Sequence, residues 1–151
     1  MFSYNNAGFY VLGRIIEAVT GETFEGAVAG RIFRPLGMET STYFPEDTIV
    51  HAPAAGHIRT PAGLKVANPW RMPRSIGPGG GIISNVLEQL QYAAFHMGDG
   101  TAPGGARILR RETLELMQTP QAEAGSMCAH VGVSWMLDTI DGVRIVKHGG
   151  A

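Results

Sequence analysis

Charged residues are scarce in this sequence. They make up 17% of the 151 residues, below the roughly 25% of an average globular domain, while 44% of the residues are hydrophobic. A disordered chain combines few apolar residues with a high net charge, so this composition excludes disorder and predicts a folded chain. The length fits one domain or a piece of a larger one.

Neither sign of charge is in excess. The 12 basic and 13 acidic residues give a formal net charge of −1, and the arginines are scattered along the chain. Binding to a phosphate backbone needs clustered basic side chains, so nucleic acid is not an expected partner. No apolar run approaches the ~20 residues of a membrane span, and residues 1–30 lack the basic and then apolar order of a signal peptide. We expect no membrane span or targeting segment within this sequence.

Cysteine is almost absent. The single cysteine, Cys128, excludes an internal disulfide and leaves the cellular compartment undecided. Cys128, His130 and His148 do not follow a known spacing of zinc ligands, so no metal site is expected.

Glycine is abundant instead, with 21 residues, about twice the usual share. One cluster surrounds Pro78, in the run Gly77 to Gly81, and precedes a predicted helix as a phosphate-binding loop would. It lacks the Lys-Ser/Thr pair of a P-loop, and Ile82 occupies the place of the last glycine in a dinucleotide fingerprint. No nucleotide cofactor is expected.

Helical periodicity dominates the first part of the chain. Apolar residues recur at helical spacing at Leu12, Ile15, Ile16 and Val19, which predicts a half-buried helix capped by Asn5 or Asn6 and ended by Gly21. Thr23 is expected to cap a second helix that Pro35 and Gly37 stop. The irregular residues 38–72 are expected to be functional or locally structured.

The remaining segments are predicted as helices followed by strands. Ser84 or Asn85 caps a third helix whose apolar face carries Val86, Leu90 and Met97, with Glu88 placed for a capping box. A short helix covers 111–117. Apolar residues then alternate from Val131 to Leu137, which predicts one strand, and the Asp141-Gly142 turn leads into a second strand over 143–148.

Four short runs, in order, resemble the serine β-lactamase and penicillin-binding-protein-like hydrolases, especially their class C and esterase branch. The runs are SYNNAGFYVLGRIIEAVTG (3–21), PLGMETSTYF (35–44), GGGIISNVLEQLQYAAF (79–95) and KHGGA (147–151). The resemblance implies an α+β fold of the β-lactamase/transpeptidase type, truncated to most of its helical region and one antiparallel β-hairpin. Residues 1–151 would then form one partial domain.

The same resemblance implies catalytic roles. In the family a serine attacks an acyl carbonyl and forms an acyl-enzyme, and Tyr4 matches the residue that accepts and returns the serine proton. Asn6 would bind a lysine or the substrate amide. His148 is preferred over its neighbour Lys147 for the third motif, because this register puts Ala151 at the position whose backbone N–H donates to the oxyanion.

Further residues are expected to line the substrate site: Gly79, Gly80, Gly149, Gly150 and Trp70. Trp70, between Pro69 and Pro73, would form an apolar wall, although a position in the core fits the sequence equally well. Tyr4 could also be an ordinary aromatic beside a helix start, and His148 to Gly150 a strand that ends in a turn. The family uses no metal or organic cofactor.

The family's nucleophile motif, Ser-x-x-Lys, is absent from this sequence. The only lysines, Lys65 and Lys147, follow Ala62 and Arg144 at that spacing. We therefore expect an internal fragment of a serine hydrolase that acts on an ester, an amide or a β-lactam, inactive alone and prone to self-association. The departure from Lys-Thr-Gly at the third motif disfavours a β-lactam. The alternative is a non-catalytic scaffold or binding protein of the same fold.

Overall fold

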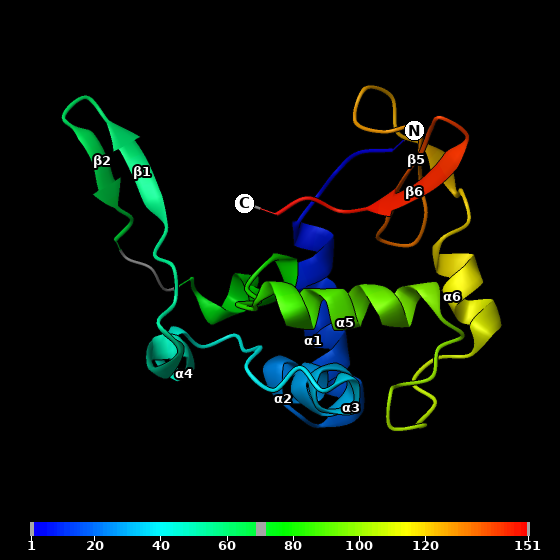
Figure 1. Ribbon diagram of the computed structural model, residues 1–151, viewed down its shortest axis with the longest axis horizontal. Coiled ribbons are helices and arrows are strands. Elements are labelled where there is room, and N and C mark those ends of the chain that lie inside the picture. Colours follow the sequence, from blue (N-terminus) through cyan, green and yellow to red (C-terminus); the bar gives the residue numbers. More distant parts are fainter. Residues whose placement is uncertain (1, 69–71, 151) are drawn as a thin grey trace. The chain divides into compact units, whose positions relative to one another are not determined.

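The chain divides into two compact units. The computed structural model describes residues 2–68 and 72–150. One unit, the helical unit, covers residues 6–91, and the other, the sheet unit, combines residues 1–5 with 92–151; the division falls inside helix α5 (Val86–Met97). The helical unit runs from blue to green in Figure 1, and most of the sheet unit runs from green to red.

Helix α1 (Ala7–Thr20) opens the helical unit and confirms the first predicted helix. The backbone carbonyl of Asn6 accepts hydrogen bonds from Phe9 and Tyr10, and Gly21 ends the helix in a left-handed conformation at φ 70°. Its apolar stripe is less buried than predicted. Ile15 is 49% exposed and Val19 is 76% exposed, while Gly13 is the residue of this helix that is buried.

Gly13 is buried because a loop approaches α1 at this point. A Cβ atom on Gly13 would lie 2.3 Å from Cγ of Pro78, and one on Gly79 would lie 2.5 Å from the ring of Tyr10. Pro78 and Gly79 belong to η3 (Arg74–Gly79), a short 3-10 helix. The two glycines therefore allow the backbone of α1 and the glycine-rich loop to pack in direct contact.

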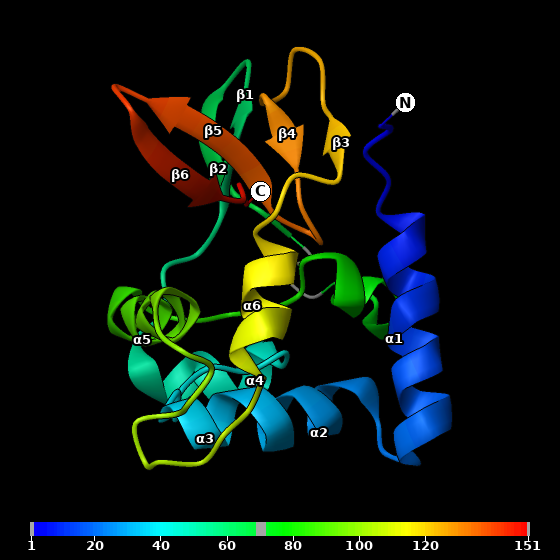
Figure 2. The same ribbon diagram turned by 90° about the vertical axis from the view of Figure 1, so that its right-hand side faces the viewer.

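The second helical segment is continuous but changes its pitch. It comprises α2 (Phe24–Val28), the π-helical turn η1 (Ala29–Phe33) and α3 (Arg34–Leu36). Thr23 caps it as predicted, accepting a hydrogen bond from the backbone of Gly26 at 3.1 Å. The expectation that Pro35 stops the helix is wrong: a wider turn just before Pro35 accommodates its missing N–H and its ring, and Gly37 at φ 72° is the terminator. Figure 2 shows this segment running crosswise to α1.

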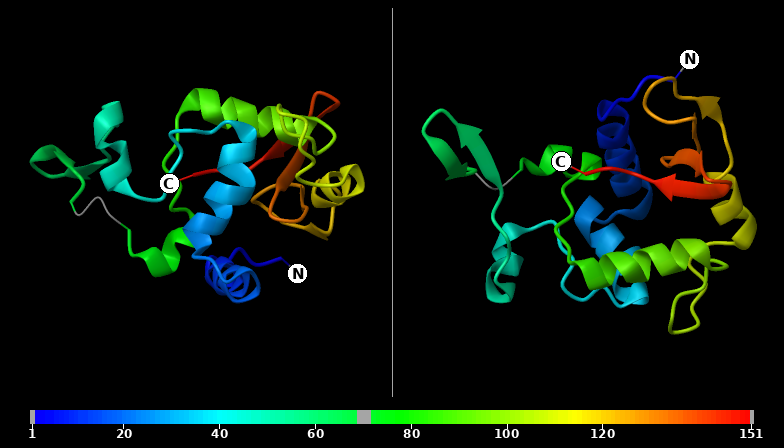
Figure 3. Two further views of the ribbon diagram at one scale, coloured as in Figure 1. Left: turned by 90° about the horizontal axis from the view of Figure 1, so that it is seen from below. Right: turned by 45° about the horizontal axis from the view of Figure 1, so that its top comes forward.

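The irregular residues 38–72 contain local structure. They form α4 (Pro45–Thr48), the 3-10 turn η2 (Ile49–His51) and a hairpin of β1 (His57–Thr60) and β2 (Gly63–Val66). The hairpin is a two-stranded antiparallel sheet, and seven of its eight strand residues are exposed. Figures 1 and 3 show it projecting away from the helices of its own unit. Its short strands carry no strong alternation of apolar and polar residues, so the sequence did not predict it.

A buried carboxylate joins residues 40–42 to the start of α5. Asn85 caps α5 by accepting from the backbone of Leu87 and Glu88, as predicted. The Glu88 carboxylate, 7% exposed, accepts hydrogen bonds from the backbone and hydroxyl of Thr40, each at 2.8 Å, and from the Ser41 hydroxyl at 2.5 Å. Burial raises the pKa of Glu88, but these donors together outweigh burial and leave the pKa below its usual value.

The sheet unit contains a short helix and four antiparallel strands. Helix α6 (Arg111–Met117) precedes β3 (Ala122–Glu123), β4 (His130–Val131), β5 (Met136–Ile140) and β6 (Val143–Lys147). The strands follow the order β3-β4-β5-β6, so the sheet is larger than the predicted hairpin (Figure 2). The Asp141-Gly142 turn is confirmed, with φ 51° and 80°, values that suit a two-residue hairpin turn.

The predicted single strand from Val131 to Leu137 is wrong. Val131 ends β4 and Leu137 lies in β5, and the chain turns between them. Gly132 donates its N–H to the carbonyl of Trp135 at 2.8 Å, and Ser134 has φ 65°. Apolar residues on both sides of a tight turn thus mimicked the alternation of one strand, because both strands bury side chains against the same core.

The core of the sheet unit lies between the end of α5, α6 and the sheet. Phe95, Leu114, Val131 and Leu137 are each less than 9% exposed. The His96 ring contacts those of Tyr92 and Trp135, with centroids 4.6 and 5.0 Å away, and burial lowers its pKa. No helix in the described ranges has the length and apolar character needed to cross a bilayer.

The contact at Gly13 yields a paired prediction for the full-length protein. Gly13→Ala should destabilise it by about 1–2 kcal/mol, because the overlap with the rigid Pro78 ring outweighs the gain in helix propensity. Gly8→Ala, in the same helix with open space around it, should be neutral or stabilising. Thermal unfolding followed by circular dichroism measures both, and equal effects of the two substitutions would contradict the packing argument.

The Glu88 network predicts a dependence on pH. A carboxylate whose pKa is lowered by folding stabilises the fold above its ordinary pKa of 4.5, and this contribution disappears as the pH falls through the lowered value. Glu88→Gln should therefore reduce stability at pH 7, and the difference from wild type should shrink as the pH falls below 4.5. Denaturant titrations at a series of pH values measure this. A difference that stays constant with pH would contradict it.

Candidate active site

Tyr4 and His148, 144 residues apart in sequence, lie in contact in the sheet unit. The Tyr4 hydroxyl oxygen is 3.4 Å from Nε2 of His148, and the two ring centroids are 6.0 Å apart at an angle of 35°. Tyr4 comes from the segment before α1, and His148 follows directly after β6. Both side chains are exposed, so the pair is accessible from solvent.

The second nitrogen of the same imidazole defines its tautomer. Nδ1 of His148 is 2.6 Å from the carbonyl oxygen of Gly149. A carbonyl only accepts, so Nδ1 carries the hydrogen and, in the neutral ring, Nε2 presents its lone pair to the Tyr4 hydroxyl. This arrangement allows His148 to accept the phenol hydrogen, or, when protonated, to stabilise a phenolate.

Lys147 is engaged elsewhere. Its ammonium group lies 2.7 Å from Oδ2 of Asp138 on the neighbouring strand. The pKa of Asp138 is lowered by Lys147 first and by the backbone N–H of Ala129 second, and Asp138 raises the pKa of Lys147. Of the two registers open for the third motif, the structure brings His148 to Tyr4 and Lys147 to Asp138.

The other residues singled out in the sequence are distributed over both units. Gly149 and Gly150 are exposed and directly follow His148. Asn6, Gly79 and Gly80 belong to the helical unit. Trp70 and Ala151 lie outside the described residues. The roles of these residues stay predictions.

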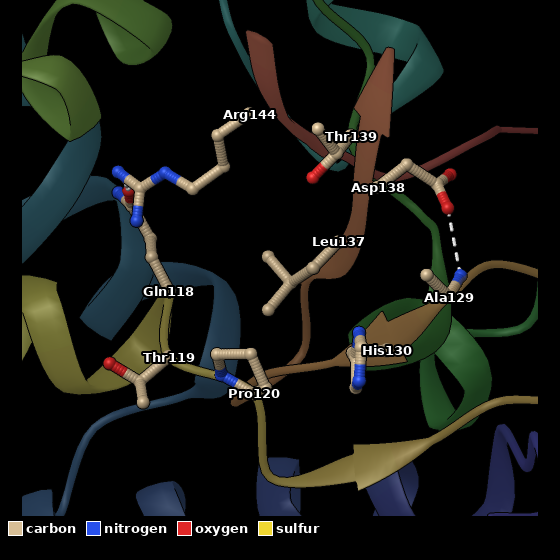
Figure 4. Close-up of a pocket in the computed structure, with 9 residues that line it drawn as sticks. All are labelled: Gln118, Thr119, Pro120, Ala129, His130, Leu137, Asp138, Thr139 and Arg144. Carbon is tan, nitrogen blue, oxygen red and sulfur yellow. Dashed lines mark hydrogen bonds between the residues drawn. The ribbon is translucent and has the colours of Figure 1, made fainter. Parts of the chain in front are cut away.

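A shallow hollow of about 330 Å³ lies on the sheet unit, apart from Tyr4 and His148. Its walls include Pro120, His130, Leu137, Thr139 and Arg144 (Figure 4). Within the described part of the chain, no three His, Cys, Asp or Glu side chains gather as metal ligands. The Tyr4 and His148 pair is therefore the best candidate for chemistry. The structure also singles out Asp138, which no sequence motif marked and which pairs with Lys147, the residue before His148.

Comparison with known proteins identifies the family. The β-lactamase family model matches residues 1–151, the whole chain. The chain belongs to the β-lactamase family. Penicillin-binding protein 4 from Amycolatopsis lactamdurans is 34% identical over 159 aligned residues, which cover 100% of this chain and 41% of that protein. A D-aminopeptidase from Cereibacter sphaeroides is 29% identical, covering 99% of this chain and 27% of the relative.

A solved structure has the same fold. The octameric penicillin-binding protein homologue from Pyrococcus abyssi superimposes with a TM-score of 0.83 and 28% identity, over 100% of this chain and 33% of that chain. The predicted fold class, a truncated β-lactamase/transpeptidase-like α+β fold, is confirmed. The chain spans less than half the length of each of these three relatives.

The tautomer of His148 is directly measurable. We expect the neutral His148 ring to carry its hydrogen on Nδ1, because the Gly149 carbonyl accepts it. Two-bond proton–nitrogen correlation spectra of the neutral ring distinguish the tautomers. His57, on the exposed hairpin, serves as the comparison in the same spectrum. A His148 ring with its hydrogen on Nε2 would contradict the assignment and remove the acceptor from Tyr4.

Proposed function

We propose that the protein carrying these residues is a serine hydrolase that works through an acyl-enzyme and acts on amides or peptides with a D-amino acid next to the cleaved bond. Support comes from membership of the β-lactamase family and from similarity to a D-aminopeptidase. The third motif also departs from the Lys-Thr-Gly usual in β-lactamases, which disfavours a β-lactam substrate. The observation that carries the proposal is the contact between Tyr4 and His148.

Tyr4 needs help to take a proton from serine. A phenol titrates near 10, so at neutral pH it is protonated and is a poor base unless a neighbour accepts its proton or stabilises the phenolate. Nε2 of His148, 3.4 Å from the hydroxyl, is placed for both tasks. Hydrogen bonds of catalytic pairs are often long without substrate and shorten when it binds.

In the proposed reaction the serine oxygen attacks the acyl carbonyl while its proton passes to the Tyr4 oxygen and the proton of the Tyr4 hydroxyl passes to Nε2 of His148, which returns it when Tyr4 gives up the serine proton. The same proton then goes to the leaving amine, the C–N bond breaks and the acyl-enzyme forms. Water repeats the sequence: its proton passes to Tyr4, and the serine oxygen leaves protonated. We propose that the backbone N–H of Ala151 donates to the oxyanion and that Asn6 binds the substrate amide.

The remaining predicted residues complete this proposal. Gly79, Gly80, Gly149 and Gly150 would let the substrate approach the backbone, and Trp70 would supply an apolar wall. No serine among these 151 residues has a lysine three residues later, so the nucleophile is proposed to come from chain outside them, with residues 1–151 forming one partial domain.

Substitution of Tyr4 in the full-length protein tests the proposal. Tyr4→Phe should lower kcat/KM for D-alanine p-nitroanilide by about 10²–10⁴-fold, because loss of a general acid–base group has this cost. Tyr10→Phe, which removes a hydroxyl from a neighbouring tyrosine outside the pair, is the matched control and should change the rate little. The isolated 151-residue chain should show no turnover of the anilide or of nitrophenyl esters.

Three results would contradict the proposal. Full activity of Tyr4→Phe would remove Tyr4 from the mechanism. Equal rates with the D- and L-alanine anilides would remove the preference for D-amino acids. A full-length protein without any hydrolase activity would favour the alternative of a scaffold or binding protein with the same fold.

A further inference from the structure

An ion pair between neighbouring strands sits one residue before His148. Lys147 at the end of β6 binds Oδ2 of Asp138 in β5 at 2.7 Å. The other carboxylate oxygen, Oδ1, accepts the backbone N–H of Ala129 at 2.7 Å. Asp138 therefore ties the last residue of β6 to the segment that leads into β4.

The strand register explains how this ion pair affects the direction of the His148 side chain. Asp138 is opposite Ile145, so Lys147 lies diagonally across from it on the same face of the sheet. Successive side chains of an extended chain point to opposite faces, so a lysine fixed on one face directs the next side chain to the other. Figure 4 shows the Asp138 carboxylate turned toward Ala129, away from the side to which Leu137 points.

We propose that Asp138 and Lys147 are positioning residues that hold His148 in contact with Tyr4. Lys147 anchors the end of β6 at the point where regular strand pairing stops, and Asp138 supplies the fixed partner. The consequence for catalysis rests on the proposed function, whereas the consequence for the geometry of the Tyr4 and His148 rings does not.

The pair is better fixed than an ordinary surface ion pair. The Asp138 side chain is 21% exposed and is held at both oxygens, whereas in the Arg111 and Glu115 pair the two side chains are 70% and 62% exposed. The pKa of Asp138 lies below and that of Lys147 above the ordinary value, so both groups stay charged around neutral pH.

Three substitutions in the full-length protein test the proposal. Asp138→Asn keeps an oxygen for the Ala129 N–H but removes the charge, and Lys147→Met removes the ammonium from a half-exposed position. Lys147→Arg keeps the charge and is the conservative rescue. Glu115→Gln, which breaks the exposed pair on α6, is the matched control.

The first readout is independent of activity. In wild type, Glu115→Gln and Lys147→Arg, nuclear Overhauser effects should connect the Tyr4 and His148 ring protons, as their 6.0 Å centroid separation allows. In Asp138→Asn and Lys147→Met these effects should fall at least twofold.

The second readout is kcat/KM for D-alanine p-nitroanilide, which should fall about tenfold in the same two variants. Their unfolding temperatures should stay close to wild type, and Lys147→Arg should retain activity.

Two results would overturn the positioning role. The first is an unchanged ring contact in Asp138→Asn and Lys147→Met. The second is an equal loss in Lys147→Arg together with a lowered unfolding temperature, because this would indicate general destabilisation.

If Tyr4→Phe leaves hydrolysis intact but Asp138→Asn still separates the rings, the proposed function fails and the positioning role stands. If Tyr4→Phe abolishes hydrolysis and Asp138→Asn leaves both ring contact and rate unchanged, only the positioning role fails.

Discussion

The antiparallel pairing of β5 with β6 determines the geometry of the candidate site. Its register sets Leu137 opposite Val146 and Met136 opposite Lys147, and the Asp141-Gly142 turn defines that register. A slip by one residue would exchange the faces of the strand, so that Lys147 would turn away from Asp138 and His148 away from Tyr4. The contact between Tyr4 and His148 thus depends on backbone hydrogen bonds that neither side chain makes.

Only two of these 151 residues are lysines, Lys65 and Lys147. Under the proposed function Tyr4 acts as a base and needs a neighbouring cation or proton acceptor. Of these two lysines, one lies on an exposed hairpin and the other is paired with Asp138. An imidazole supplies either function, because its charge changes near neutral pH. In the structure the Lys147 ammonium pairs with Asp138, and the His148 imidazole faces the Tyr4 phenol.

Sequence patterns predicted local features well where a single residue dictates the backbone. Thr23 and Asn85 cap helices, Gly21 and Gly37 end them, and Asp141-Gly142 forms a hairpin turn, since each depends only on contacts within a few residues. Patterns failed where no residue type marks the local backbone. The π-turn before Pro35, the division of 131–137 into two strands and the hairpin over 57–66 have no distinct local signal.

The sequence by itself determined the family, because the order of its short motifs is a property of the chain, and it determined the caps at Thr23 and Asn85 and the final turn for the local reasons above. The predicted Asn6 cap of the first helix makes no side-chain capping hydrogen bond. Only the tertiary structure showed that His148 lies against Tyr4 and Lys147 against Asp138, since both residues fit the motif and differ by the face of the strand on which they lie. It also decided that Glu88 accepts from Thr40 and Ser41, 48 and 47 residues away. Contacts at such separations depend on how the elements pack, which local patterns do not encode.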